Sequence, residues 1–235
     1  MREKTITPNS ADVTDFVVAA LSDTLSAFGV PGVSTLAAAA RQALQSRYAQ
    51  RAQEAQQILL EEIRAGETLP QSISLEEPAA IMVRYARAIH EGVGRINLRL
   101  LAAVLAGQLA QEAVYADEFY RWADILAGLT TDEIIILAGY LRHMSEDIRT
   151  ANLIELGAKV YHDIHGPEDN RWSDFEATRG ALLRTGLLSI SATGGAIGGG
   201  SNIAFAPTSK LQELGRLVKM EEVLERSDYR PRESE

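Results

Sequence analysis

The side chains best suited to metal or acid–base chemistry gather in one short run: His162, Asp163, His165, Glu168 and Asp169. Imidazole and carboxylate groups bind zinc and can act as general acids or bases. The run lacks His-Glu-x-x-His, the spacing that places two histidines on one helix face around a metal. It also adjoins a Gly-Pro turn, where polar residues are usually solvated. We therefore predict a solvated loop and no metal site.

A second candidate is the glycine run Gly194–Gly200, because glycine-rich loops can cradle phosphate groups. A dinucleotide fingerprint requires glycines between a strand and a helix, and a phosphate loop ends in Gly-Lys-Ser or Gly-Lys-Thr. Here the glycines lead into another alternating segment and no such tripeptide occurs, so we predict a hairpin tip. No nucleophile–base pair or carboxylate pair can be located either. The sequence thus predicts a protein that is not an enzyme and uses no cofactor.

Composition narrows the function further. Cysteine is absent from the 235 residues, which excludes disulfide bonds and thiolate chemistry and is typical of a reducing compartment. The 23 basic residues are outnumbered by 32 acidic ones, and a net charge of −9 has the wrong sign for a surface that binds nucleic acid throughout. Because the N-terminus shows no apolar signal core, we expect a cytoplasmic protein.

The stretch Thr24–Ala40 carries no charge and is the segment that most resembles a membrane span. It is shorter than the ~20 mostly apolar residues of a spanning helix, and Gly29-Val-Pro-Gly interrupts it. We predict two helix ends that meet at this turn, and no membrane partner. A hairpin that touches a membrane is the alternative.

From Ser34 to Arg64, apolar residues recur every three or four positions, which is the period of a helix. This helix is rich in alanine, whose small side chain lets a neighbouring backbone approach closely. A helix of this length also has more apolar surface than one small domain is expected to cover. We therefore predict a homodimer with contacts at Leu44, Tyr48 and Leu59.

A second long helix is predicted over Leu75–Ala113, with Gly92 and Gly94 marking a kink or a close helix crossing. Its start carries a Ser-x-x-Glu capping box at Ser74. Glu91 is spaced to pair with arginines four residues away on either side. These belong to a stripe that could contact an acidic partner or form a solvated helix face, and the stripe comprises Arg84, Arg87, Arg95 and Arg99.

The remaining chain predicts a helix over Asp117–Leu126, then helices over 130–144, 148–164 and 174–186. Residues 187–206 alternate around the glycine run and predict a two-stranded hairpin, and a last helix starts near Ser209. Ser-x-x-Glu-type capping boxes are predicted at Thr130, Ser173 and Ser209. The predicted fold class is mainly α, with a long-helix bundle in residues 1–127, a module with one β-hairpin in 128–225 and a charged tail in 226–235.

Segments near the C-terminus resemble a known superfamily. Ala181-Leu-Leu-Arg-Thr-Gly-Leu-Leu, the glycine-rich tip and Ala206-Pro-Thr-Ser-Lys-Leu-Gln-Glu-Leu follow in the order of the third helix, wing and final helix of winged-helix proteins, and the resemblance covers Thr130–Met220. It implies a module that binds DNA or docks a protein. The whole layout also resembles uncharacterised bacterial and phage-linked helical proteins, including the abortive-infection alpha type, in which no motif defines a chemistry.

Charge argues against DNA as the partner of this module. Residues 128–220 contain nine basic and eleven acidic side chains, and the glycine-rich tip has no cation. Phosphate contacts need positive partners. The predicted third helix offers two, Arg179 and Arg184, and Thr178 directly precedes Arg179. These three residues are the candidate contacts to DNA or to a protein.

Two functions follow from the sequence. In the first, a non-enzymatic bacterial or phage-related regulatory protein self-associates through its helical part and docks a protein partner through the winged-helix-like module. In the second, the chain is a dimeric DNA-binding transcriptional regulator. The negative charge favours the first.

Overall fold

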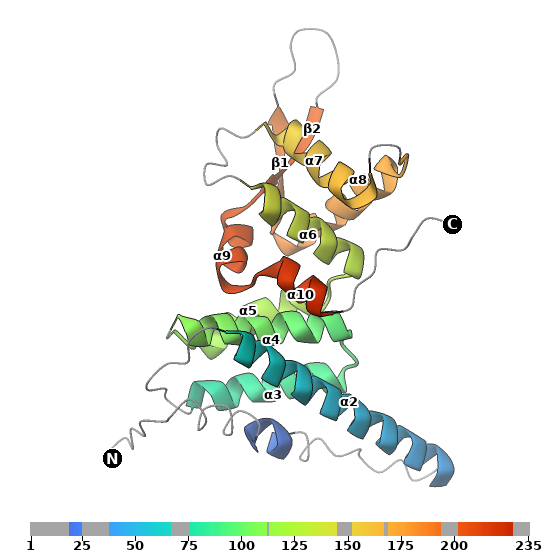
Figure 1. Cartoon of the computed structure of the whole chain (residues 1–235), viewed down its shortest axis with the longest axis vertical. Coiled ribbons are helices and arrows are strands. Elements are labelled where there is room, and N and C mark those ends of the chain that lie inside the picture. The colour runs from blue at the N-terminus through green and yellow to red at the C-terminus, as the bar shows by residue number, and fades with distance from the viewer. Residues whose placement is uncertain are drawn as a thin grey trace. The chain divides into compact units, whose positions relative to one another are not determined.

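A computed structural model gives the fold and describes residues 19–24, 38–66, 76–111, 113–144, 152–166, 169–193 and 202–227 (Figure 1). Within those residues the chain is mainly helical and carries one two-stranded antiparallel sheet, as predicted. It divides into two compact units, an N-terminal unit of residues 1–128 and a C-terminal unit of residues 129–235. The predicted turn at Gly29–Gly32, the tip Gly194–Gly200 and the tail after residue 227 lie outside the described residues.

The described helices of the N-terminal unit are a short stretch at residues 19–24 followed by α2 (Ala38–Ala65), α3 (Glu76–His90), α4 (Arg95–Ala110) and α5 (Ala116–Leu126). Helix α2 packs along α4, and α3 packs on α5. Helix α4 is buried around most of its circumference, which its leucine- and alanine-rich sequence favours. It is the centre of this unit.

The predicted single helix over Leu75–Ala113 is two helices. Helix α3 ends at His90, and Gly92 has a φ of 85°, a left-handed conformation that a helix cannot contain. The predicted kink or crossing is therefore a complete break. Arg51 of α2 stabilises it by donating hydrogen bonds to the carbonyl oxygens of Ile89, at 3.0 Å, and Val93.

The described part of the C-terminal unit begins with three helices, α6 (Thr131–His143), α7 (Leu153–His165) and α8 (Trp172–Leu182), and α8 is followed by a 3₁₀ turn at Leu183–Thr185. The hairpin follows as β1 (Leu188–Thr193) and β2 (Asn202–Pro207), and α9 (Ser209–Leu217) and α10 (Met220–Arg226) close the unit. Strand pairing runs from Leu188↔Pro207 to Thr193↔Asn202, which confirms the predicted hairpin. Strand β2 lies beside α7 (Figure 1).

The predicted helix caps are partly right. At α6, Glu133 N–H donates to Thr130 Oγ1 at 3.3 Å and Thr130 N–H donates to Glu133 Oε2 at 2.8 Å, so this capping box is confirmed. Helix α8 starts at Trp172 without a side-chain cap, so the box predicted at Ser173 is wrong. The cap of α9 is Thr208 rather than Ser209.

The predicted last helix is two short ones, because α9 ends at Leu217 and the extended Val218 separates it from α10. No helix in the described part of the chain is both long and apolar enough to cross a membrane.

Candidate functional site

The predicted contact Arg179 lies in the core of the C-terminal unit, where its side chain is 4% exposed. Its Nη1 donates to the Tyr140 hydroxyl at 3.0 Å, and its Nη2 pairs with Glu176 one turn back on α8. The guanidinium lies over the rings of Phe175 and Phe205, each at 4.6 Å. A group enclosed in this way cannot reach a phosphate on a DNA surface.

The sequence of α8 explains why Arg179 faces inward. Phe175, Arg179 and Leu182 are spaced by four and three residues, so they share one face of the helix, and all three are buried. Gly157 of α7 makes room for the guanidinium, since a Cβ at that position would lie 2.5 Å from Nη1 of Arg179. The spacing can be read from the sequence. The sequence does not show what stabilises the buried guanidinium, namely the ion pair, the space left by Gly157 and the aromatic rings.

The second predicted contact, Arg184, is half exposed and pairs with Glu133 of α6, whose carboxylate is 3% exposed. Nη2 of Arg184 donates to Glu133 Oε2 at 2.8 Å. Burial disfavours ionisation of Glu133, but hydrogen bonds from Arg184 and from Thr130 N–H outweigh it and lower the pKa of the carboxyl. Arg184 thus balances a buried negative charge, and a phosphate would have to compete with it.

The surface that α8 presents to solvent is uncharged or acidic. Thr178 is half-buried, and its hydroxyl donates to the Asp174 carbonyl at 2.9 Å within the helix. The exposed positions are Trp172, Ser173, Asp174, Ala177 and Ala181. Trp172 is 41% exposed and contacts the Tyr161 ring edge-on at 4.8 Å. An indole, three small residues and one acid offer no cation to a phosphate.

The four arginines predicted as one stripe in the N-terminal unit lie on two helices, and each has an acidic partner within that unit. Arg87 pairs with Glu91 at 2.7 Å, as predicted. Arg95 pairs with Glu54 of α2 at 3.0 Å rather than with Glu91. Arg84 pairs with Asp124 at 2.9 Å.

Arg99 is the exception among the four, because its side chain is only 2% exposed. It bonds to Glu62, also 2% exposed, at 2.8 Å and to Glu61 at 2.9 Å. These two ion pairs connect α4 with α2 inside the unit, so the charge of Arg99 is not exposed to a partner. The hydrogen bond from Arg99 is the main cause of the lowered pKa of the Glu61 carboxyl.

Of the predicted dimer contacts, the two whose side chains are described, Tyr48 and Leu59, are not both at the surface. Leu59 is fully buried inside its own unit, and Tyr48 is half-buried with its ring edge-on to His90 at 5.8 Å. The side chain of Leu44 lies outside the described residues. The described exposed positions of α2 are mostly polar.

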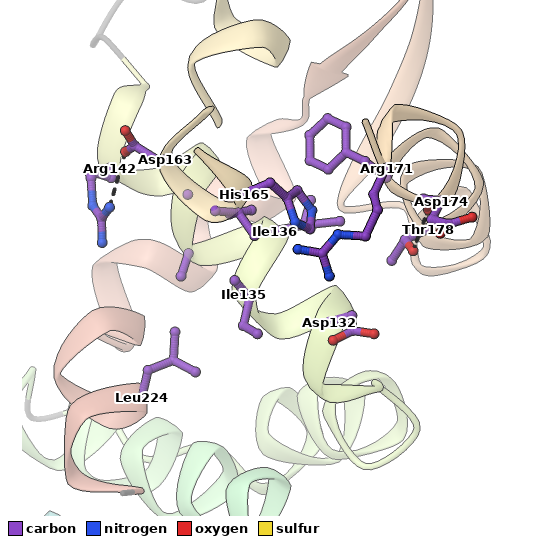
Figure 2. A pocket seen from close by; sticks show the side chains of 14 residues that line it. Asp132, Ile135, Ile136, Arg142, Asp163, His165, Arg171, Asp174, Thr178 and Leu224 are labelled. Carbon is purple, nitrogen blue, oxygen red and sulfur yellow. Dashed lines mark hydrogen bonds and ion pairs between the residues drawn. The ribbon is translucent and has the colours of Figure 1, made fainter. Parts of the chain in front are cut away.

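A cavity of about 380 Å³ opens between α6, α7, α8 and α10 of the C-terminal unit (Figure 2). Its apolar wall includes Ile135, Ile136, Phe175 and Leu224. His165 lies at its centre, within 5.0 Å of the Tyr161 ring. Charged side chains stand around the opening, and they are Asp132, Arg142, Asp163, Arg171 and Asp174.

Two of those charges are already paired. Arg142 bonds to Asp163 at 3.1 Å and to Glu221, while Nε2 of His143 lies 2.5 Å from the same Asp163 carboxylate. The bond to His143 and the Arg142 guanidinium lower the pKa of Asp163. This arrangement neutralises Arg142.

On the other side of the cavity, Arg171 bonds to Asp169 at 2.6 Å and lowers the pKa of that carboxyl strongly. Desolvation lowers the pKa of His165, and the positive charge of Arg171 adds to the effect. In the part of the chain that the structure describes, no three His or carboxylate side chains gather as metal ligands; Glu168 lies outside it. Of the run singled out in the sequence, Asp163 and His165 line the cavity.

Comparison with known proteins gives no relative: no protein-family model, curated protein or solved structure matches this chain.

Proposed function

We propose that this chain is a non-enzymatic interaction or regulatory protein whose C-terminal unit is a winged-helix-like module that docks a protein partner. The order α6, α7, α8, hairpin and closing helices supports the module assignment. In such modules the third helix, here α8, is the usual contact to a partner. The observation that carries the proposal is the burial of Arg179, which removes the central cation from that helix.

The exposed apolar side chains of the unit support a protein partner. Trp172 of α8 is 41% exposed, Ile154 of α7 is 49% exposed and Ile190 of β1 is 57% exposed. Large apolar side chains on a surface are typical of contact residues in protein interfaces. DNA contact, by contrast, requires several free cations, because phosphates supply most of the non-specific affinity.

A titration with duplex DNA tests the proposal. A fluorescein-labelled duplex of about 30 base pairs is titrated with the chain at about 25 mM and about 150 mM salt, and its anisotropy is measured. We expect no saturable binding tighter than about 100 µM at either salt concentration, the weak end of non-specific DNA affinity. Arg184→Glu should leave this result unchanged, and Lys219→Glu, a charge reversal on another exposed site of the unit, serves as the control.

The dimeric DNA-binding regulator is the outcome that overturns the proposal. In that case the duplex would bind tightly, and the affinity would fall steeply with salt. Arg184→Glu would abolish the binding, whereas the Lys219→Glu variant would still bind. Binding lost equally in both variants would indicate general electrostatic attraction rather than recognition by α8.

Self-association through the N-terminal unit is the second part of the proposal. Leu59 cannot serve a dimer contact because its own unit covers it, so a contact on α2 would have to use other positions, Leu44 included. Light scattering after size exclusion at tens of micromolar should give about twice the 25.6 kDa chain mass. A mass of one chain would contradict this part and leave the docking module unaffected.

A further inference from the structure

The cavity of the C-terminal unit has the size and lining of a binding site. Its volume of about 380 Å³ lies at the lower end of the roughly 300–1,000 Å³ of ligand pockets. Ile136 and Phe175 are almost fully buried in its wall, and Ile135 and Leu224 are half exposed to it. An apolar side chain that entered would be covered on the faces formed by α6, α8 and α10 (Figure 2).

The charges at the opening are not balanced. Arg142 and Arg171 each have their own carboxylate partners, Asp163 and Asp169, within hydrogen-bond distance. The side-chain carboxylates of Asp132 on α6 and Asp174 on α8 form no hydrogen bond or ion pair with another described residue, although Asp174 is near enough to Arg171 to raise the pKa of that guanidinium. Both lie close enough to His165 for their negative charge to favour its protonated form. Figure 2 shows Asp132 and Asp174 on the Arg171 side of the opening.

We propose that this cavity binds a segment of the partner protein in which a lysine or arginine adjoins an apolar side chain. The apolar side chain enters the cavity against Phe175 and Ile136, and the cation lies between the carboxylates of Asp132 and Asp174. The inference rests on the proposed docking function and names the chemistry of its partner.

Charge complementarity selects this occupant. An acidic segment would meet the two unpaired carboxylates, and the arginines that could attract it are already neutralised. A purely apolar segment would leave both carboxylates partly desolvated and unpaired, which is unfavourable. The net charge of −9 of the whole chain also attracts a basic partner over longer distances.

Asp132 and Asp174 also stabilise the helices that carry them, and the test must separate this effect from binding of the partner. Each lies in the first turn of a helix, where a carboxylate interacts favourably with the helix dipole. Asp117 lies in the first turn of α5 in the other unit, at the second residue of the helix as Asp132 does in α6, and is also exposed. Asp117→Asn is therefore the matched control for loss of a first-turn carboxylate.

The experiment uses the isotope-labelled full chain and two dipeptide probes, N-acetyl-Leu-Arg-amide and N-acetyl-Leu-Glu-amide. Each is added to about 10 mM while the imidazole signals are followed by NMR, with His165 assigned through His165→Gln. We expect the arginine probe to shift the His165 signal saturably and the glutamate probe to leave it unchanged. Asp132→Asn with Asp174→Asn should weaken binding of the arginine probe at least about tenfold. Asp117→Asn should not change it.

Three results would overturn the inference: no shift of His165 with the arginine probe, equal shifts with both probes, or undiminished binding by the double variant while its amide spectrum shows it folded. None of these affects the proposed docking function. That function fails separately, if a DNA duplex added to the same sample shifts the amide signals of α8 in a salt-dependent manner.

Discussion

Replacing Arg179 with alanine should destabilise the C-terminal unit, because the side chain is a structural element of its core. The variant loses the hydrogen bond to the Tyr140 hydroxyl at 3.0 Å and the contacts with Phe175 and Phe205 at 4.6 Å. A hydrogen bond to a charged group contributes about 1.5–3 kcal/mol, and a desolvated cation–π contact contributes about 1–2 kcal/mol.

Two observations reduce the expected total. Glu176 keeps a third of its side chain exposed, so its carboxylate can hydrate once the arginine is gone. Nε of Arg179 has no partner in the folded unit, which already lowers the net benefit of burying the guanidinium. Breaking a fully buried pair costs about 3–5 kcal/mol, and we expect about 3 kcal/mol here.

Hydrogen exchange followed by mass spectrometry measures this loss locally. Peptides from α6 and α8 should exchange roughly a hundredfold faster in Arg179→Ala, since each 1.4 kcal/mol is about tenfold, and peptides from α4 should be unchanged. Lys159→Ala, which removes an exposed ion pair with Glu155 on α7, should change exchange by less than about threefold. Equal protection in Arg179→Ala and the wild type would refute the buried placement.

The Gly157 gap gives an independent check by a double-mutant cycle. Gly157→Ala places a methyl group 2.5 Å from Nη1 of Arg179 and should destabilise the unit on its own. In the Arg179→Ala background the same change should cost at least about 1 kcal/mol less. Strictly additive effects would mean that the two side chains do not meet.

Three further predictions concern other elements. Glu62→Ala should destabilise the N-terminal unit in urea unfolding by about 2–3 kcal/mol, below the about 3–5 kcal/mol of a buried charge left with no partner, because Arg99 would lose its buried partner but keep its bond to Glu61. Gly92→Ala should cost about 1–2 kcal/mol by the same measurement, since a Cβ there meets nothing within 4 Å and the penalty is the φ of 85° alone. Burial and Arg171 hold the pKa of His165 below 6.5, against the opposing charges of Asp132, Asp169 and Asp174. Just below pH 6.5, His165 is therefore protonated more in the unfolded chain than in the folded one. The contribution of His165 to the stability of the C-terminal unit should be complete above pH 6.5 and should decrease as the pH falls below 6.5. His165→Gln should flatten this fall, and an NMR titration midpoint of His165 at or above 6.5 would contradict it.

Local signals in the sequence predicted most of the elements. The capping box at Thr130 and Glu133 depends on residues three apart and was found. The hairpin at 188–207 also follows from alternation around glycines. Gly92 was recognised as a special position, but a period of 3.6 continues across it, so the break in the helix was not predicted. Arg51, which donates to the Val93 carbonyl beside this glycine, lies 42 residues before Val93 in the chain.

The site could not be predicted in the same way because it depends on contacts between distant elements. Arg179 was interpreted as a surface cation, since an arginine is rarely buried without partners. Its partners lie on α6, on β2 and one turn away on α8, and Gly157 on α7 leaves the space. The cavity likewise combines residues from Asp132 to Leu224, which no local pattern connects.

The most direct test of the account is the chemical accessibility of the Arg179 guanidinium. Phenylglyoxal modification of the folded chain, mapped by mass spectrometry over time, compares Arg179 with Arg87. Both arginines form an ion pair with a glutamate one helical turn away, but the side chain of Arg87 is 64% exposed and that of Arg179 is 4% exposed. We predict modification of Arg87 at least about tenfold faster, with Arg179 reacting only through local opening of the unit. Reaction of the two at rates within about twofold would place Arg179 on the surface and return DNA recognition by α8 to consideration.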